Sequence, residues 1–279
     1  MMIKSKKLLF QNLDRKQAKE SIISLAQQEY LKRCQREKHM IQFWQWILMI
    51  LFLGLWEVGA RTGVINDFVF SSPSGVVETM ITMSKDGSLW YHTGITLAET
   101  FLSFLLIFVI GIGIAVVLWW NTTVSKIFEP YLVVLNSLPK SALAPVFIVW
   151  LGANMKTIIV AAVSVAVFGS ILTLYHSFSE TEEDKLKLIY TLGGTKKDVL
   201  TKVILPGNIP TVISLMKVNL GLSLVGVIIG EFLAAKAGLG YLIIYASQVF
   251  KLDYVITSIF ILCVISVLLY HGISRFERK

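Results

Sequence analysis

Four ionisable side chains lie inside long apolar stretches of this chain, where a charge is costly and therefore marks a candidate functional site. They are Glu99, Lys140, Lys217 and Glu231. Inside a membrane, such groups mark solute pathways, relay protons or pair with one another. Each of the four is therefore a functional hypothesis to be weighed against a structural role.

Lys140 lies between Pro139 and Pro145, two residues that interrupt a helix. A broken helix within a membrane exposes backbone groups toward a cavity, where a lysine can attract an anionic solute. The alternative is that Lys140 extends its ammonium group to an interface. We place Lys140 on a candidate substrate path and leave the second role open.

Glu99 and Glu231 are predicted near the outer ends of their spans, and both join Lys140 as candidate substrate-path residues. For these two carboxyl groups the sequence favours a structural pair or a gate at the external mouth over contact with solute. Lys217 is predicted two turns inside its span, where its long side chain can reach the inner surface.

Catalytic chemistry has little support in the sequence. His92, His176 and His271 lie near segment ends and His39 lies in the basic leader, and none has a metal-binding partner at ligand spacing. Two cysteines, far apart, predict neither a disulfide framework nor a redox motif. We therefore predict no catalytic residue, no metal site and no cofactor in this chain, which argues against a membrane-embedded enzyme.

The composition favours a membrane protein, because 55% of the residues are hydrophobic and only 16% are charged. Most of the net charge of +8 comes from residues 1–45, which hold ten basic and four acidic side chains. A basic segment before the first apolar stretch is not a nucleic-acid-binding patch on a soluble fold. We predict contact with membrane lipid and no nucleic-acid partner.

Six apolar segments are long enough to cross a bilayer as helices. They are residues 43–60, 95–120, 127–151, 157–178, 209–234 and 254–270. The predicted fold class is thus an all-α polytopic membrane protein with about six transmembrane helices. Five glycines allow close helix packing in the bundle or at an interface between copies: Gly111, Gly113, Gly221, Gly226 and Gly230.

The basic residues also predict the orientation, because Lys and Arg are retained on the cytoplasmic side during insertion. With the N-terminus inside, inner segments hold 19 basic residues and outer segments hold five. We expect a multi-pass protein of the cell membrane with both termini in the cytoplasm. Residues 1–42 form a basic leader that stays attached and either lies along anionic lipid or acts as a cytosolic helix, and residues 43–279 form the membrane domain.

The loop 179–208 is polar yet patterned as two short helices. Thr181 with Asp184, and Thr195 with Asp198, have the spacing of helix caps. The pair Gly193-Gly194 would end the first helix, and Pro206 would end the second. Pattern alone gives even support to packing of this loop on its own bundle and to docking on a partner.

This loop resembles the "EAA" loop of permease subunits of ATP-binding cassette (ABC) importers. That motif has Glu-Ala-Ala, three residues, Gly, nine residues, and Ile, any residue, Leu-Pro. In this chain Gly193 and Leu205-Pro206 stand at the same spacing, while Lys187-Leu188-Ile189 replaces the opening and Val203 replaces Ile. Residues 70–73, 138–152 and 230–241 are similar to the branch that imports nitrate, taurine, alkanesulfonates and thiamine-pathway pyrimidines.

The resemblance implies a type I importer fold and a set of partners. These are two copies of a cytoplasmic ATPase that binds ATP and Mg²⁺, a second permease copy that makes a homodimer, and an extracytoplasmic solute-binding protein. It also implies that a coupling helix, here about residues 184–194, inserts into a groove of the ATPase. The carried-over coupling residues are Leu188, Ile189, Leu192, Gly193, Gly194, Leu205 and Pro206. No phosphate-binding Gly-x-x-x-x-Gly-Lys-[Ser/Thr] loop occurs in this chain, so hydrolysis belongs to the partner.

The alternative is an ion-coupled secondary transporter or a channel that acts alone. Paired carboxylates at mid-span or inverted repeats would favour it. The sequence has neither, and the spacing from Gly193 to Pro206 has no role in that class.

Overall fold

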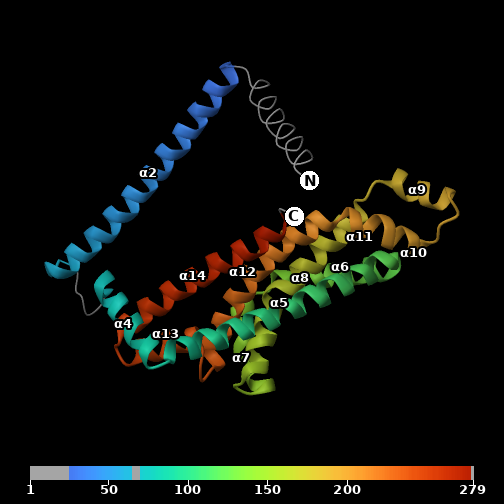
Figure 1. The fold of residues 1–279 in the computed structure, drawn as a ribbon. Coiled ribbons are helices and arrows are strands. Elements are labelled where there is room, and N and C mark those ends of the chain that lie inside the picture. Colours follow the sequence, from blue (N-terminus) through green and yellow to red (C-terminus); the bar gives the residue numbers. More distant parts are fainter. Residues whose placement is uncertain (1–24, 65–69, 278–279) are drawn as a thin grey trace, which may run out of the picture. The chain divides into compact units, whose positions relative to one another are not determined.

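The computed structural model describes residues 25–64 and 70–277 (Figure 1). The chain divides into two units, Met1–Ile65 and Asn66–Lys279. Helix α2 (Leu25–Arg61) belongs to the first unit and contains the predicted span 43–60. It begins well before that span, because residues 25–42 are good helix formers and include no proline or glycine.

The second unit is built around three long helices, α5 (Ser88–Trp120), α8 (Met155–Ser179) and α12 (Ile209–Ala234), which pack against one another (Figure 1). Small residues let α8 and α12 approach closely. A Cβ on Gly226 would lie 2.6 Å from the Ala162 Cα, and one on Gly230 would lie 3.0 Å from the Ile158 Cα. Gly226 and Gly230 therefore serve packing within the bundle, one of the two predicted roles, whereas a Cβ on Gly113 or Gly221 would meet no neighbouring helix within 4 Å.

The third predicted span, 127–151, is not one straight helix. Helix α6 (Thr122–Ser137) and helix α7 (Lys140–Leu151) meet at a bend of 97°. Pro139 lacks an N–H group and holds Leu138 in an extended conformation, so the helix cannot continue through this pair. Figure 1 shows α7 turning away from the line of α6.

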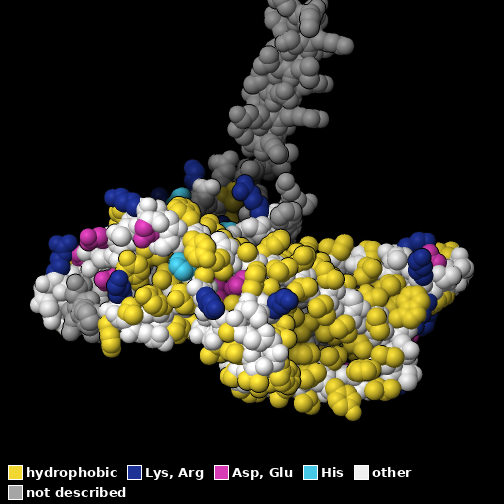
Figure 2. Space-filling view, turned by 90° about the horizontal axis from the view of Figure 1, so that it is seen from below, with side chains coloured by type: hydrophobic (Ala, Val, Ile, Leu, Met, Phe, Trp, Pro, Cys, Tyr) yellow, Lys and Arg dark blue, Asp and Glu magenta, His cyan; other side chains and the backbone are white. Residues whose placement is uncertain are grey.

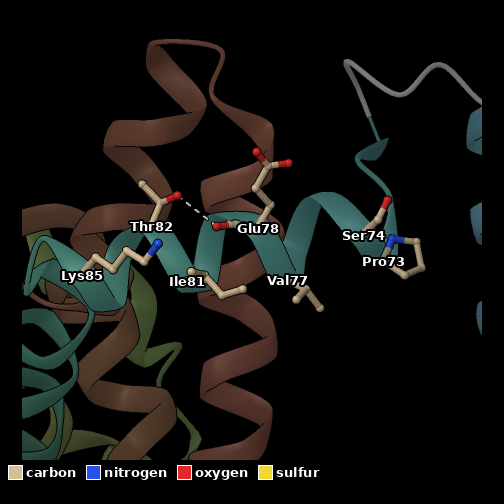
Figure 3. Close-up of a pocket in the computed structure, with 7 residues that line it drawn as sticks. All are labelled: Pro73, Ser74, Val77, Glu78, Ile81, Thr82 and Lys85. Atoms are coloured by element: carbon tan, nitrogen blue, oxygen red, sulfur yellow. Dashed lines mark hydrogen bonds between the residues drawn. The ribbon is translucent and has the colours of Figure 1, made fainter.

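Helices α4 (Pro73–Lys85) and α13 (Leu239–Gln248) close the end of the bundle near the start of α5, and α14 (Leu252–Glu277) begins there and runs back along the bundle. Met83, Leu239 and Ile261 contribute one buried side chain from each to a common core cluster. The Ser72 side chain caps α4 by accepting the Gly75 N–H at 3.2 Å. The outer face of α4, with exposed Val77, forms a shallow groove (Figure 3).

Five described helices are long and apolar enough to cross a membrane, and the bent pair α6–α7 raises the number to six. The predicted all-α membrane fold with about six spans is therefore confirmed, with the third span corrected to a broken one. Hydrophobic side chains cover much of the face seen in Figure 2, and basic and acidic side chains lie toward both ends of the view, one of which carries α9 (Glu183–Thr191).

Candidate functional site

A helical elbow joins α8 to α12 at one end of the bundle (Figure 1). It contains α9 (Glu183–Thr191), α10 (Lys196–Val199), a π-helical turn (Leu200–Ile204) and α11 (Leu205–Gly207). We call residues 183–207 the elbow. Helix α9 matches the predicted first helix, residues 184–194, except that it begins one residue earlier and ends before the two glycines.

The sharp turn between α9 and α10 depends on two glycines. Gly193 has φ of 80°, a conformation that glycine adopts without steric cost. A Cβ on Gly194 would lie 2.5 Å from the Ile189 side chain and 2.9 Å from its carbonyl oxygen. The elbow can therefore reverse direction this tightly only with glycine at these positions.

Thr195 and Asp198 form the predicted capping box at the start of α10. The Thr195 hydroxyl accepts the Asp198 N–H at 3.4 Å, and the Asp198 carboxylate accepts the Thr195 N–H at 2.9 Å. Lys202 lies 2.8 Å from the same carboxylate. Hydrogen bonds from Lys202 and from Thr195 lower the pKa of Asp198, so this group stays ionised and keeps its partners at neutral pH.

The predicted cap by Thr181 is wrong. Helix α9 begins after Glu182 without a side-chain cap. The Thr181 hydroxyl instead accepts a hydrogen bond from Asn208 Nδ2 at 3.4 Å. Asn208 also donates to the Ile204 carbonyl at 2.8 Å and accepts from the Ser177 hydroxyl at 2.5 Å. This buried amide fastens the elbow to the ends of α8 and α12.

The apolar residues of the elbow divide into two groups. Val199 and Ile204 are fully buried against the bundle, and Ile189 packs on the same cluster. By contrast, Leu188 is 58% exposed and Leu192 is 75% exposed. Pattern alone supported packing and docking equally. In the structure the first group anchors the elbow, while Leu188 of α9 and Leu192 directly after it are exposed.

Lys196 ties the elbow to the end of α5. Its Nζ donates to the Trp120 carbonyl at 2.6 Å and lies 5.5 Å and 5.6 Å from the ring centres of Trp119 and Trp120. A cation at a helix C-terminus and over aromatic rings is favourable on both counts. Neither Lys196 nor Asn208 was singled out from the sequence. Asn208 directly follows the Leu205-Pro206-Gly207 turn, which was the available signal, whereas the Lys196 contact spans 76 residues.

Lys140 lies at the bend between α6 and α7, where its Nζ donates to the Asn136 carbonyl. Its ammonium group therefore satisfies a carbonyl left open at the end of α6. Leu205 and Pro206 lie in α11, at the far side of the elbow from α9. Lys217 is half-buried on α12 and lines a small cavity with Ser266 of α14.

Glu99 and Glu231 are brought together between α5 and α12, at the end of the bundle opposite the elbow. Glu231 is 1% exposed and accepts hydrogen bonds from the Thr96 hydroxyl at 2.7 Å and from the Gly240 N–H at 2.5 Å. Glu99 is equally buried, and its Oε2 has no hydrogen-bond partner among the residues that the structure describes. The structure thus brings the two carboxyl groups together inside the bundle.

The sequence is similar to a known family of membrane transport proteins. A model of the "Binding-protein-dependent transport system inner membrane component" family matches residues 107–279. A probable ABC transporter permease protein of Haemophilus influenzae is 30% identical over 228 residues, which cover 82% of this chain and 92% of that protein. The formylaminopyrimidine transport permease protein ThiX of Halalkalibacterium halodurans is 28% identical over 83% of this chain and 92% of its own length.

Solved structures agree on the fold. An inward-facing structure of the MetNI methionine ABC transporter superposes with a TM-score of 0.61 at 20% identity, covering 68% of this chain and 96% of the matched chain. The family model extends over more than half of the sequence and includes the elbow, α12, α13 and α14. The chain is a multi-pass membrane protein that belongs to the binding-protein-dependent transport system inner membrane component family, the permeases of ABC importers.

Proposed function

We propose that this chain is the pore-forming subunit of an ABC importer and that α9 is the helix through which a cytoplasmic ATPase drives it. In this proposal two copies of the chain pair with two ATPase subunits, which bind ATP and Mg²⁺, and an extracytoplasmic binding protein delivers the solute. Both termini and the elbow face the cytoplasm, as the distribution of basic residues favours.

The observation that carries the proposal is the exposed apolar surface formed by Leu188 of α9 and by Leu192 directly after it. Leu188 and Leu192 are one helical turn apart, so they lie on one face and form a pair of anchors of the helix-in-groove type. The residues that hold α9 in place, Ile189 and the two glycines of the turn, are separate from these anchors. A helix that is fixed at its base and apolar at its surface can transmit movement of a partner to the bundle.

The solute is proposed to be a small anion of the sulfonate, nitrate or taurine kind, or a thiamine-pathway pyrimidine. The name of the relative ThiX supports the pyrimidine. Lys140 at the bend of α6 and α7 supports the anion, since it places a positive charge beside a broken helix. Uptake into vesicles with each solute class, comparing Lys140→Met with Lys140→Arg, separates them. If the solute is an anion, its apparent affinity should fall in Lys140→Met and be kept in Lys140→Arg. If it is a pyrimidine, neither variant should change the affinity.

Co-purification tests the ATPase assignment. The chain is expressed with a tagged candidate ATPase, and complexes that survive detergent are compared for the wild type, Leu188→Asp and Gly193→Asp. A charge at position 188 would be buried without a partner in an apolar groove. We expect the wild type to form a complex and both variants to lose it.

A matched control is Val77→Asp, which puts the same charge on an equally exposed apolar position of α4, at the opposite end of the bundle. This variant should retain the ATPase. A wild-type chain that recruits no ATPase yet moves solute by itself in liposomes would contradict the proposal and indicate a secondary transporter or channel.

A further inference from the structure

The turn between α12 and α13 lies at the end of the bundle opposite the elbow, and the functional assignment gives it no role (Figure 1). Three consecutive backbone N–H groups in this turn donate to side chains of other helices. Gly238 donates to His92 Nδ1 at 3.0 Å, Leu239 to Thr96 Oγ1 at 2.8 Å, and Gly240 to Glu231 Oε2 at 2.5 Å. These groups begin α13, whose N-terminus has no cap from its own turn.

The three acceptors are themselves connected. The Thr96 hydroxyl donates to Glu231 Oε1 at 2.7 Å, so one hydroxyl bridges the backbone of α13 and the carboxylate of α12. Thr96 and Glu231 are 0% and 1% exposed. His92 also stacks on Tyr241 of α13, with ring centres 6.2 Å apart. Helices α5 and α12 thus hold the start of α13 at several linked points.

The glycines of the turn exist because the Glu231 carboxylate lies directly against the backbone. A Cβ on Gly240 would lie 2.8 Å from Glu231 Oε2, and one on Gly238 would overlap the same carboxyl group. Gly238 also has φ of 114°, which side chains other than that of glycine rarely allow. Glycine at positions 238 and 240 therefore leaves the room that the Glu231 carboxylate occupies.

We propose that His92, Thr96 and Glu231 are positioning residues that form a latch, fixing α13 to α5 and α12 so that these three helices move as one body during transport. Separating α13 would strip the buried Glu231 carboxylate of the Gly240 N–H and leave three backbone N–H groups unsatisfied. The latch therefore stays closed through the transport cycle. The end of the bundle opposite the elbow then opens by movement of α5, α12 and α13 together, and not by movement of α13 alone. This inference rests on the proposed importer function, which supplies the transport cycle.

The test measures the distance between α5 and α13. Spin labels are placed at the exposed positions Trp90 and Tyr245 in the full chain, with Cys34 and Cys263 replaced by Ser. Variants with one label correct for distances between copies. In the wild type we expect one narrow distance distribution that is the same without nucleotide and with ATP and vanadate in the complex with the ATPase.

Thr96→Val removes the bridging hydroxyl and keeps the side-chain shape. We expect the distance distribution to broaden about two-fold, because the start of α13 loses its local anchoring. Thr96→Ser keeps the hydroxyl and should match the wild type. Ser223→Ala removes another fully buried hydroxyl, one that bonds only within α12, and should also match it. If Thr96→Val does not fold, His92→Leu removes a single acceptor and should broaden the distribution in the same direction.

A narrow distribution in a folded Thr96→Val or His92→Leu chain overturns the latch, as does a wild-type distance that shifts when nucleotide binds. The comparison of variants without nucleotide needs no ATPase. Failure of the chain to bind an ATPase would therefore count against the proposed function, while the distances would still decide whether α13 is latched.

Discussion

Replacing Leu188 or Leu192 by alanine should weaken ATPase binding without weakening the fold. Complete burial of a leucine side chain stabilises a complex by about 1.5–3 kcal/mol. Leu188 and Leu192 are 58% and 75% exposed in the free chain, so only that share remains to be buried on docking. Each leucine then contributes about 1–2 kcal/mol, and each alanine variant should lose roughly 5- to 30-fold in affinity.

The assay is titration of the purified chain in lipid nanodiscs with its ATPase, with thermal unfolding measured in parallel. Val77→Ala on α4 is the matched control, because Val77 is 56% exposed and lies at the opposite end of the bundle. Ile189→Ala should instead lower the melting temperature, unlike Leu188→Ala and Leu192→Ala, because Ile189 packs on the buried cluster. Unchanged affinity in Leu188→Ala and Leu192→Ala, or an equal loss in Val77→Ala, would refute the docking role of this face.

Three other expectations concern the elbow and the bundle. Lys196→Ala should raise the number of ATP molecules hydrolysed per solute imported, because α5 loses its link to the elbow, while Lys196→Arg keeps the charge and should restore the ratio. Gly226→Ala should lower the yield of folded protein by overpacking against α8, at a cost of about 1–3 kcal/mol, whereas Gly221→Ala meets open space and should not. Since its partners lower the pKa of Asp198, the stability from this carboxylate should be complete above the ordinary aspartate pKa and disappear only as the pH falls through the lowered value. Wild-type thermal unfolding minus that of Asp198→Asn, followed against pH, measures that contribution.

Local signals in the sequence were sufficient for much of the elbow. The capping box of Thr195 and Asp198 needs residues only three apart, and the turn at Gly193 needs one conformation that glycine allows. The long spans were equally accessible, because an apolar segment of this length has few alternatives to a membrane helix. The capping box, the glycine turn and the apolar spans depend on residues close together in the sequence, so a local pattern is enough to predict them.

Other features depend on contacts that no local pattern contains. Two prolines predicted a break in the third span, but the 97° bend also depends on the packing of α7 against α8. Leu188 and Ile189 are adjacent and equally apolar, yet one is exposed and the other packs on the bundle. The choice between them follows from the direction in which α9 leaves α8. Only the folded chain sets that direction.

Helix α5 connects the two ends on which these inferences depend. Near its start, His92 and Thr96 hold the backbone of α13, and at its last residue the Trp120 carbonyl accepts the Lys196 ammonium group. A straight helix of 33 residues spans about 50 Å. Movement of the elbow would therefore reach the opposite end through one continuous helix, and the latch would carry α13 with it. Loss of Lys196 and loss of the Thr96 hydroxyl should then impair the same motion from opposite ends of α5.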